Sequence, residues 1–178
     1  MERQNRTLFL DRDGIVNVRL VGDYVKAPSQ LILKDDFLEV MEQMAPHFQK
    51  IFIITNQQGI GKGLMTFQDL ERVHAEMLRQ LSSRHIPVTK IYVCPHLASD
   101  GCNCRKPAVG LAQQAKADFP DIDFSQSVMV GDALSDLQFG RACGMKTVFV
   151  NDAQVELTPE LCQAADVVVD RLTVEALS

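Results

Sequence analysis

The chain has 178 residues, 46% of them hydrophobic and 23% charged, and its formal net charge is -5. This length gives one domain with a sizeable core, so we expect a single domain over residues 1–178. The acidic balance and the lack of a basic run argue against a protein that holds a nucleic-acid backbone. No window approaches the roughly 18 apolar residues of a membrane span, and the polar start, Met1–Arg6, lacks the apolar stretch of a secretion signal. We expect a cytoplasmic monomer without a nucleic-acid or membrane partner.

Strands and helices are predicted to alternate along the whole chain. Short β-branched or aromatic runs predict strands at Thr7–Leu10, Ile51–Thr55, Lys90–Val93, Ser127–Gly131, Thr147–Val150 and Val167–Val169. Helices are predicted at Phe37–Ala45, Phe67–Arg84, Val109–Ala117, Leu134–Cys143 and Thr173–Leu177. Because the strands are apolar on both faces, helices should cover both sides of the sheet. The pattern predicts an α/β fold with a doubly wound, mainly parallel, Rossmann-like sheet.

The first predicted strand ends in two carboxylates, Asp11 and Asp13, followed by Gly14. Side chains two residues apart on a strand point to the same side, and open α/β sheets bind ligands at the carboxyl ends of their strands. One carboxylate can attack a phosphoryl group while the other moves protons, and together they can hold a hard divalent cation. Taken alone, the pair also fits a solvated turn at the end of a strand.

Two later positions carry groups that can bind a phosphoryl group. The second predicted strand ends in Thr55 and Asn56, whose hydroxyl and amide can bond phosphate oxygens without adding negative charge. Lys106 follows Arg105, and a lysine beside an attacked phosphoryl group can neutralise developing charge. In isolation, a strand-ending turn and a surface basic pair are the simpler interpretations.

The fourth predicted strand also ends in an acid. Asp132 follows Gly131 and can complete a magnesium site with Asp11 and the main-chain carbonyl of Asp13. Asp136 comes four residues later. It can position the metal ligands without binding the metal itself, or it can simply be an acid in the first turn of a helix.

Together these four strand ends resemble the motifs of the haloacid dehalogenase superfamily of phosphatases. The motifs are matched by Asp11-Arg-Asp13-Gly14, Thr55-Asn56, Lys106 and Gly131-Asp132, and the resemblance covers roughly residues 7–150. It implies that Asp11 attacks phosphorus and becomes an aspartyl phosphate, while Asp13 protonates the leaving oxygen and then deprotonates water.

The resemblance also implies how the phosphoryl group and its metal are held. Thr55 and Lys106 would bind the phosphoryl group, and Mg²⁺ would lie between Asp11, Asp13 and Asp132. A metal ion that spreads charge and residues that position the reactants account for most of the rate in such chemistry.

A second metal site is predicted at Cys94, His96, Cys102 and Cys104, which fall within eleven residues. Three thiolates and an imidazole suit tetrahedral zinc with no position left for water, so such a zinc would be structural. Unrelated buried cysteines and a surface histidine are the alternative. Metal-bound thiolates also fit a reducing compartment, whereas Cys143 and Cys162 are expected to be small core residues.

The predicted zinc loop limits the resemblance to one branch of the superfamily. Cys-x-His…Cys-x-Cys-Arg-Lys-Pro resembles the branch that contains the D-glycero-D-manno-heptose 1,7-bisphosphate 7-phosphatases and the histidinol-phosphatases. Members of this branch lack a large cap domain, and no insertion here is long enough to form one. The resemblance implies that the zinc loop and two segments, Ile15–Tyr24 and Gln57–Gly63, shape the substrate entrance.

The loops resemble those of the heptose enzymes, which makes a sugar bisphosphate the expected substrate. The expected substrate contacts are Asn56, Gln57, Gln58, Lys62 and Arg105. Of these, Arg105 and Lys62 are the candidates for receiving the second phosphate.

Two departures favour other substrates. Only five residues separate His96 from Cys102, as in histidinol-phosphatases, and Ala133 stands where heptose enzymes often carry lysine. Histidinol phosphate or another small phosphomonoester is therefore the alternative. A catalytically inactive, zinc-stabilised binding domain is a third possibility, against which the intact motif residues argue. The histidines His47, His74 and His85 have no partner signature and are expected to be surface or packing residues.

Overall fold

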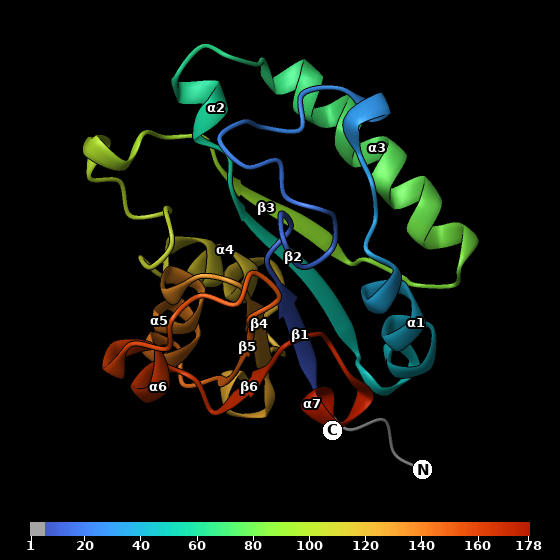
Figure 1. Ribbon diagram of the computed structural model, residues 1–178, viewed down its shortest axis with the longest axis vertical. Helices are drawn as coiled ribbons and strands as arrows, with labels where there is room; N and C mark the ends of the chain where they lie inside the picture. The colour runs from blue at the N-terminus through green and yellow to red at the C-terminus, as the bar shows by residue number, and fades with distance from the viewer. Residues whose placement is uncertain (1–5) are drawn as a thin grey trace.

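The computed structural model describes residues 6–178, which form one six-stranded parallel sheet with helices on both faces (Figure 1). The strand order is β3-β2-β1-β4-β5-β6, so the chain starts in the middle and winds outward in both directions. This confirms the predicted doubly wound sheet. The polar residues 1–5 lie outside the described residues. The strands are β1 (Thr7–Leu10), β2 (Lys50–Asn56), β3 (Lys90–Cys94), β4 (Val128–Gly131), β5 (Lys146–Val150) and β6 (Val167–Val169).

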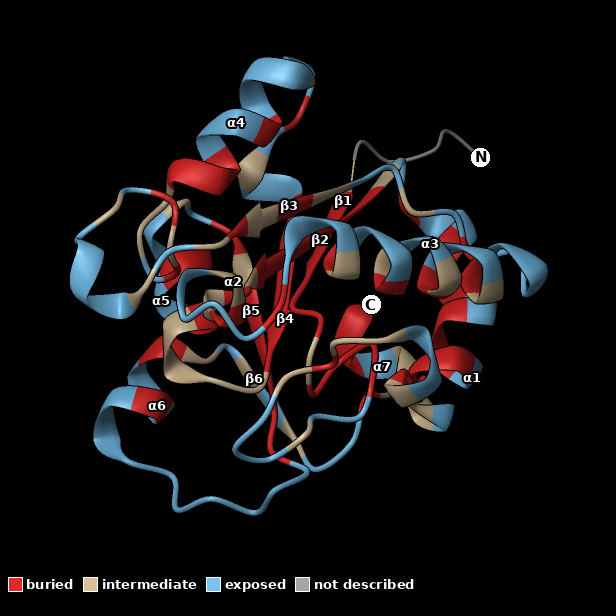
Figure 2. Ribbon diagram, turned by 90° about the horizontal axis from the view of Figure 1, so that it is seen from above, coloured by how far each residue is buried: buried red, intermediate tan, exposed pale blue. Residues whose placement is uncertain are grey.

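Alternate residues of the central strand pack into two separate cores. Leu8 and Leu10 join the core under α1 (Asp35–Met44), α3 (Phe67–Ser83) and α7 (Val174–Leu177). Phe9 faces the other way, into the core under α4 (Gly110–Asp118) and α5 (Leu134–Ala142). Figure 2 shows the central strands in red, as buried residues, between the flanking helices. This two-sided burial is why the strands are apolar on both faces.

Local chemistry explains where the main helices begin and end. Thr66 caps α3: its hydroxyl accepts from the Asp69 amide, and the Asp69 side chain accepts from the Thr66 amide. The helix α1 starts two residues earlier than predicted, because Asp35 and Asp36 stabilise its positive end. Gly144 ends α5 with φ 79°, a conformation that favours glycine.

Two short helices were not predicted. They are α2 (Gln58–Gly61) and α6 (Pro159–Ala164), and both are too short to show a helical hydrophobic period. The described residues also form four single turns of 3-10 helix, at Pro28–Gln30, Ala45–His47, Ala98–Asp100 and Phe124–Gln126. Cys162 lies exposed on α6, which corrects its predicted place in the core.

The parallel arrangement brings the carboxyl ends of β1, β2 and β4 to one edge of the sheet. Asp11, Asn56 and Asp132 lie at or just beyond these ends. Within residues 6–178, no helix is long and apolar enough to cross a membrane.

Candidate active site

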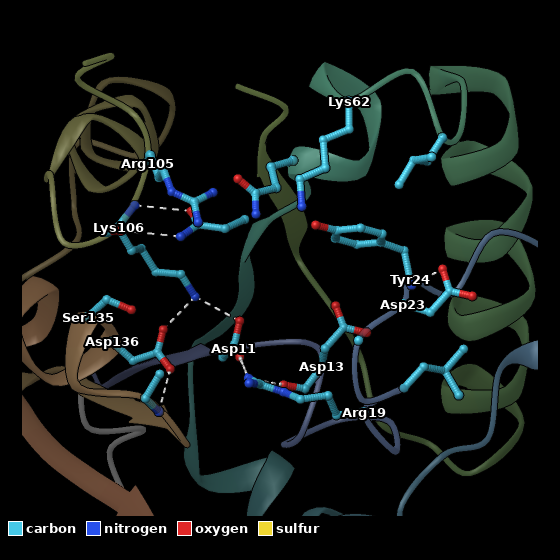
Figure 3. Close-up of a pocket in the computed structure, with 16 residues that line it drawn as sticks. Asp11, Asp13, Arg19, Asp23, Tyr24, Lys62, Arg105, Lys106, Ser135 and Asp136 are labelled. Carbon is cyan, nitrogen blue, oxygen red and sulfur yellow. Dashed lines mark hydrogen bonds and ion pairs between the residues drawn. The ribbon is translucent and has the colours of Figure 1, made fainter. Parts of the chain in front are cut away.

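The floor of the site is an ion cluster centred on Lys106. Its Nζ donates to Asp11 Oδ1 and to the main-chain oxygen of Ile54 and forms an ion pair with Asp136 Oδ1, each at 2.7 Å. Figure 3 shows its contacts with the two carboxylates. The side chains of all three charged residues are almost fully buried. Because an ammonium group has three N–H donors, this geometry satisfies Lys106 completely and fixes the orientation of Asp11. The predicted nucleophile and the predicted phosphoryl-binding lysine are thus in contact.

The charges of this cluster do not balance. Burial raises the pKa of Asp11 to about 6, and the negative charge of Asp136 adds to the shift. Burial and the charge of Asp11 raise the pKa of Asp132 to about 8. Burial opposes the charge of Lys106, but the carboxylates of Asp11 and Asp136 outweigh it and raise its pKa. Three carboxylates face two cationic groups, the buried ammonium of Lys106 and the half-exposed guanidinium of Arg19, so the cluster can attract a further cation.

The residues present fit a hard divalent cation such as Mg²⁺. Oxygen atoms of Asp11, Asp132 and Asp136 lie within 4.8 Å of one another. A Cβ at Gly14 would come within 1.9 Å of Asp132 Oδ2, so only glycine leaves room for this carboxylate. Arg19 Nη2 already lies 2.7 Å from Asp132 Oδ1 and 3.2 Å from the main-chain oxygen of Asp13. The predicted magnesium ligands therefore surround a position that attracts a cation.

The main-chain oxygen of Asp13 faces the proposed cation position, whereas its side chain is hydrogen-bonded to other residues. Oδ1 accepts from Arg12 Nη2 at 2.9 Å and from Asn17 Nδ2 at 3.0 Å, and Oδ2 accepts from Gln57 Nε2 at 2.8 Å. Burial works against ionisation, but Arg12 and the two amides hold the pKa of Asp13 below its usual range. The Asp13 carboxylate is therefore fixed by buried donors on both of its oxygens, with its side chain 24% exposed.

Gln57, predicted to contact substrate, is not among the residues that line the cavity. Gln57 is fully buried, and its amide donates to Thr55 Oγ1 at 2.8 Å as well as to Asp13. Thr55 is also buried, so its predicted phosphoryl contact stays a prediction. Asn56 lines the cavity and also pairs with the Lys106 backbone, accepting from N at 3.0 Å and donating to O at 3.2 Å. The polar residues at the end of β2 and directly after it thus hold the reacting groups in place.

Above the ion cluster lies a cavity of about 420 Å³. Arg105 and Lys106 lie on one side of it and Lys62 and Tyr24 on another, with the Lys62 Nζ 5.5 Å from the centre of the Tyr24 ring (Figure 3). Arg105 Nη1 is buried without a hydrogen-bond partner. Because a buried cationic donor without an acceptor is costly, this atom points to an anionic ligand. The volume suits a small metabolite.

Some lining residues were not singled out from the sequence. Arg19, Leu20 and Tyr24 were not named as contacts, but they belong to the segment Ile15–Tyr24 that was expected to shape the substrate entrance. Leu64 and Ser135 also line the cavity, and no sequence pattern indicated them. The predicted contacts Gln58, Lys62 and Arg105 all line it, as does Ala133.

The four predicted zinc ligands come together beside this cavity. Cys94 Sγ lies 3.6 Å from His96 Nδ1, 3.6 Å from Cys102 Sγ and 3.1 Å from Cys104 Sγ, and Cys104 Sγ lies 3.1 Å from His96 Nδ1. Four ligands around a tetrahedral zinc stand about 3.5–3.8 Å apart, given metal–ligand distances of about 2.0–2.3 Å. The donor set therefore fits zinc, and the separations of 3.6 Å match this spacing, whereas the two contacts of Cys104 at 3.1 Å are shorter. The chain turns directly from Cys104 into Arg105 and Lys106.

Arg12 lies between the two acids of the first motif and has a second side-chain partner on the helix α3. Its side chain is fully buried, and its Nη1 lies 3.1 Å from Nε2 of His74 on α3. Burial and the charge of Arg12 lower the pKa of His74 to about 3. His74 is therefore a neutral residue packed against a buried cation, which refines its predicted packing role.

This environment makes His74 a source of acid sensitivity. The unfolded chain takes up a proton at His74 below its ordinary pKa of 6.5, whereas the folded protein does not until about 3. The unfolded state binds more protons in this window, so the free energy of unfolding should fall as pH falls from 6.5 toward 3. At about pH 5 the loss from this residue is at most about 2 kcal/mol. Urea unfolding across this range should show a shallower decline for His74→Gln than for the native protein, and parallel curves would contradict the assignment.

Comparisons with known proteins agree with this geometry. A family model described as HAD-hydrolase-like matches residues 103–174. The D-glycero-alpha-D-manno-heptose-1,7-bisphosphate 7-phosphatase of Mycobacterium tuberculosis is 39% identical over 74% of this chain and 69% of its own. The enzyme of the same name from Campylobacter jejuni is 36% identical over 86% of this chain and 87% of its own. The D-glycero-beta-D-manno-heptose-1,7-bisphosphate 7-phosphatase of Neisseria meningitidis is 31% identical over 93% of this chain and 91% of its own.

A solved structure shares both the fold and the chain length. The D,D-heptose 1,7-bisphosphate phosphatase from B. bronchiseptica, crystallised with magnesium and phosphate, superposes with a TM-score of 0.82. It is 29% identical, and the match covers 97% of this chain and 96% of that one. The sheet order, the paired carboxylates at the end of β1 and these relatives lead to one assignment. The chain belongs to the heptose-1,7-bisphosphate 7-phosphatase family of the haloacid dehalogenase-like hydrolases.

Proposed function

We propose that this protein is a Mg²⁺-dependent phosphatase that removes the 7-phosphate of D-glycero-D-manno-heptose 1,7-bisphosphate. The observation that carries the proposal is the buried contact of Asp11 with Lys106 at the floor of a cavity with several cationic residues. Names of relatives that match most of the chain support the substrate. The reaction would pass through an aspartyl phosphate on Asp11.

The residues of the chain divide the chemistry between them. Asp11 attacks phosphorus, while Lys106, fixed by three acceptors, neutralises charge on the phosphoryl oxygens. Asp13, after taking up a proton from solvent, gives it to the leaving oxygen and then, as the carboxylate, takes one from the water that hydrolyses the acyl phosphate. When bound by Asp11, Asp132 and the Asp13 carbonyl, Mg²⁺ supplies further neutralisation of the phosphoryl charge. Asp136 keeps Lys106 charged and in place.

The second phosphate of the substrate would be received by Lys62 and Arg105. Both line the cavity, and the buried Nη1 of Arg105 has a free N–H for a phosphate oxygen. Histidinol phosphate would instead bring an ammonium group toward these cations. Charge therefore favours the bisphosphate over that alternative.

Removing the charge of Lys62 should test this second subsite. For Lys62→Gln we expect KM for the heptose bisphosphate to rise about tenfold, the typical effect of one charge-assisted hydrogen bond, with kcat nearly unchanged. KM for a simple sugar monophosphate should not change. Lys90→Gln, which removes an exposed lysine of β3, is the control. A native enzyme with higher kcat/KM on histidinol phosphate than on either heptose bisphosphate anomer would overturn the substrate assignment.

We also propose one structural zinc per chain, held by the four ligands described above. It would fix the turn that leads into Arg105 and Lys106 and so keep both cations in place. Thiolate ligands require a reducing environment, which supports a cytoplasmic location. We further propose that the protein is a monomer.

A further inference from the structure

Arg12 is the largest fully buried side chain of the described residues, and it joins two parts of the molecule. One end of its guanidinium donates to Asp13 Oδ1 at 2.9 Å, and the other lies 3.1 Å from His74 Nε2. Its Nε is buried without a partner. Among the described residues, this guanidinium has two polar side-chain contacts, one to the proposed proton carrier Asp13 and one to His74 on α3.

The chemistry of the contact with His74 is defined by Arg12. A guanidinium group has only donors and stays charged, so the facing nitrogen of His74 must offer its lone pair. His74 then carries its ring proton on Nδ1 and acts as an acceptor. It sits on a helix whose start is capped by Thr66 and whose neighbouring residues Val73 and Met77 are buried in the core. A rigid helix thus presents a fixed acceptor to Arg12.

We propose that His74 is a positioning residue, which holds Arg12 so that Arg12 in turn holds the Asp13 carboxylate in its reactive orientation. The inference rests on the proposed phosphatase function and deepens it. Asn17 and Gln57 also donate to Asp13, but both are neutral amides, one on the loop after β1 and the other between β2 and α2. Arg12 provides the one charged donor to this carboxylate among the described residues, and without His74 its guanidinium can tilt about the bond to Asp13. Proton transfer tolerates little misplacement of the carboxylate.

Substitution of His74 separates the role of acceptor from that of packing. In His74→Leu the acceptor is lost, and kcat on the heptose bisphosphate should fall about tenfold, part of the 10²–10⁴-fold that proton transfer contributes. KM should change less than about twofold, because His74 lines no part of the cavity. His74→Gln, whose amide oxygen can accept from Arg12, should restore most of kcat. His47→Leu, at an exposed histidine, should behave as the native protein.

The leaving group provides the sharper readout. A sugar phosphate leaves as an alkoxide that needs a proton, whereas 4-nitrophenolate leaves without one. If His74 acts through Asp13, His74→Leu should lower turnover of the sugar phosphate but hardly slow the first-turnover release of 4-nitrophenolate. A general distortion of the site would slow both equally, and that result would overturn the proposal.

A double-mutant cycle links the two residues. Arg12→Lys keeps the charge but cannot reach both partners, so His74→Leu should have no further effect on kcat in the Arg12→Lys background. Additive losses would show that the two residues act separately and would refute the proposal. The unfolding temperature of each variant identifies any that fail to fold, and His74→Gln then carries the test, since kcat far below native would also refute it. Native protein that releases no phosphate would instead reject the proposed function itself.

Discussion

Asp11→Asn is expected to abolish phosphate release, with kcat lowered by at least about 10⁴-fold, because an amide cannot form the acyl phosphate. The fold should survive. Asp11 is one of three clustered carboxylates, and burial raises its pKa to about 6, so its charge is unfavourable in the folded protein at neutral pH. Asparagine keeps an oxygen acceptor for Lys106 and removes the charge. We therefore expect an unfolding temperature equal to or higher than that of the native protein.

The matched control for this change is Asp118→Asn. Asp118 is a carboxylate at the far end of α4, paired with Lys90 and Tyr92 outside the cavity. It should leave turnover unchanged. Phosphate release by Asp11→Asn at a rate close to native, measured in the same assay, would reject Asp11 as the nucleophile.

Loss of the proposed zinc is the second large effect. Native protein should contain about one zinc per chain by elemental analysis, and Cys104→Ser should contain far less. Cys104 is buried, and its sulfur lies against both Cys94 and His96, so the remaining ligands cannot close around a metal without it. We expect the free energy of unfolding to fall by several kcal/mol. Turnover should fall as well, because the loop that leads into Arg105 and Lys106 would lose its anchor.

Cys162→Ser is the control for the zinc experiment, because Cys162 is exposed and lies outside the cluster. It should bind zinc and unfold like the native protein. A native protein that is fully folded and contains no metal after purification without chelators would contradict the zinc proposal.

The parts of the site that lie at strand ends could be predicted from the sequence. Asp11, Asn56 and Asp132 each follow a short apolar run, and parallel strands bring their carboxyl ends to one edge. Lys106 was expected near them by resemblance, and its contact with Asp11 agrees with that expectation. The four predicted zinc ligands, which begin with Cys94, could be recognised because they are close together in the sequence as well as in space.

Contacts between distant residues could not be predicted in this way. Arg12 and His74 are 62 positions apart, and no local pattern relates a helix residue to the middle of the first motif. Gln57 follows Asn56 directly, yet the strand alternation turns it into the interior toward Asp13. Side-chain direction at the end of a strand depends on where the backbone turns, which residue types alone do not define.

The central claim is that a phosphoryl group is transferred to Asp11. Native enzyme mixed with Mg²⁺ and substrate, quenched in acid within one turnover and digested, should yield the peptide containing Asp11 with the added mass of one phosphoryl group. The modification should depend on Mg²⁺ and disappear with Asp11→Asn. Rapid phosphate release with no modified peptide, or with the phosphoryl group on another residue, would contradict the account.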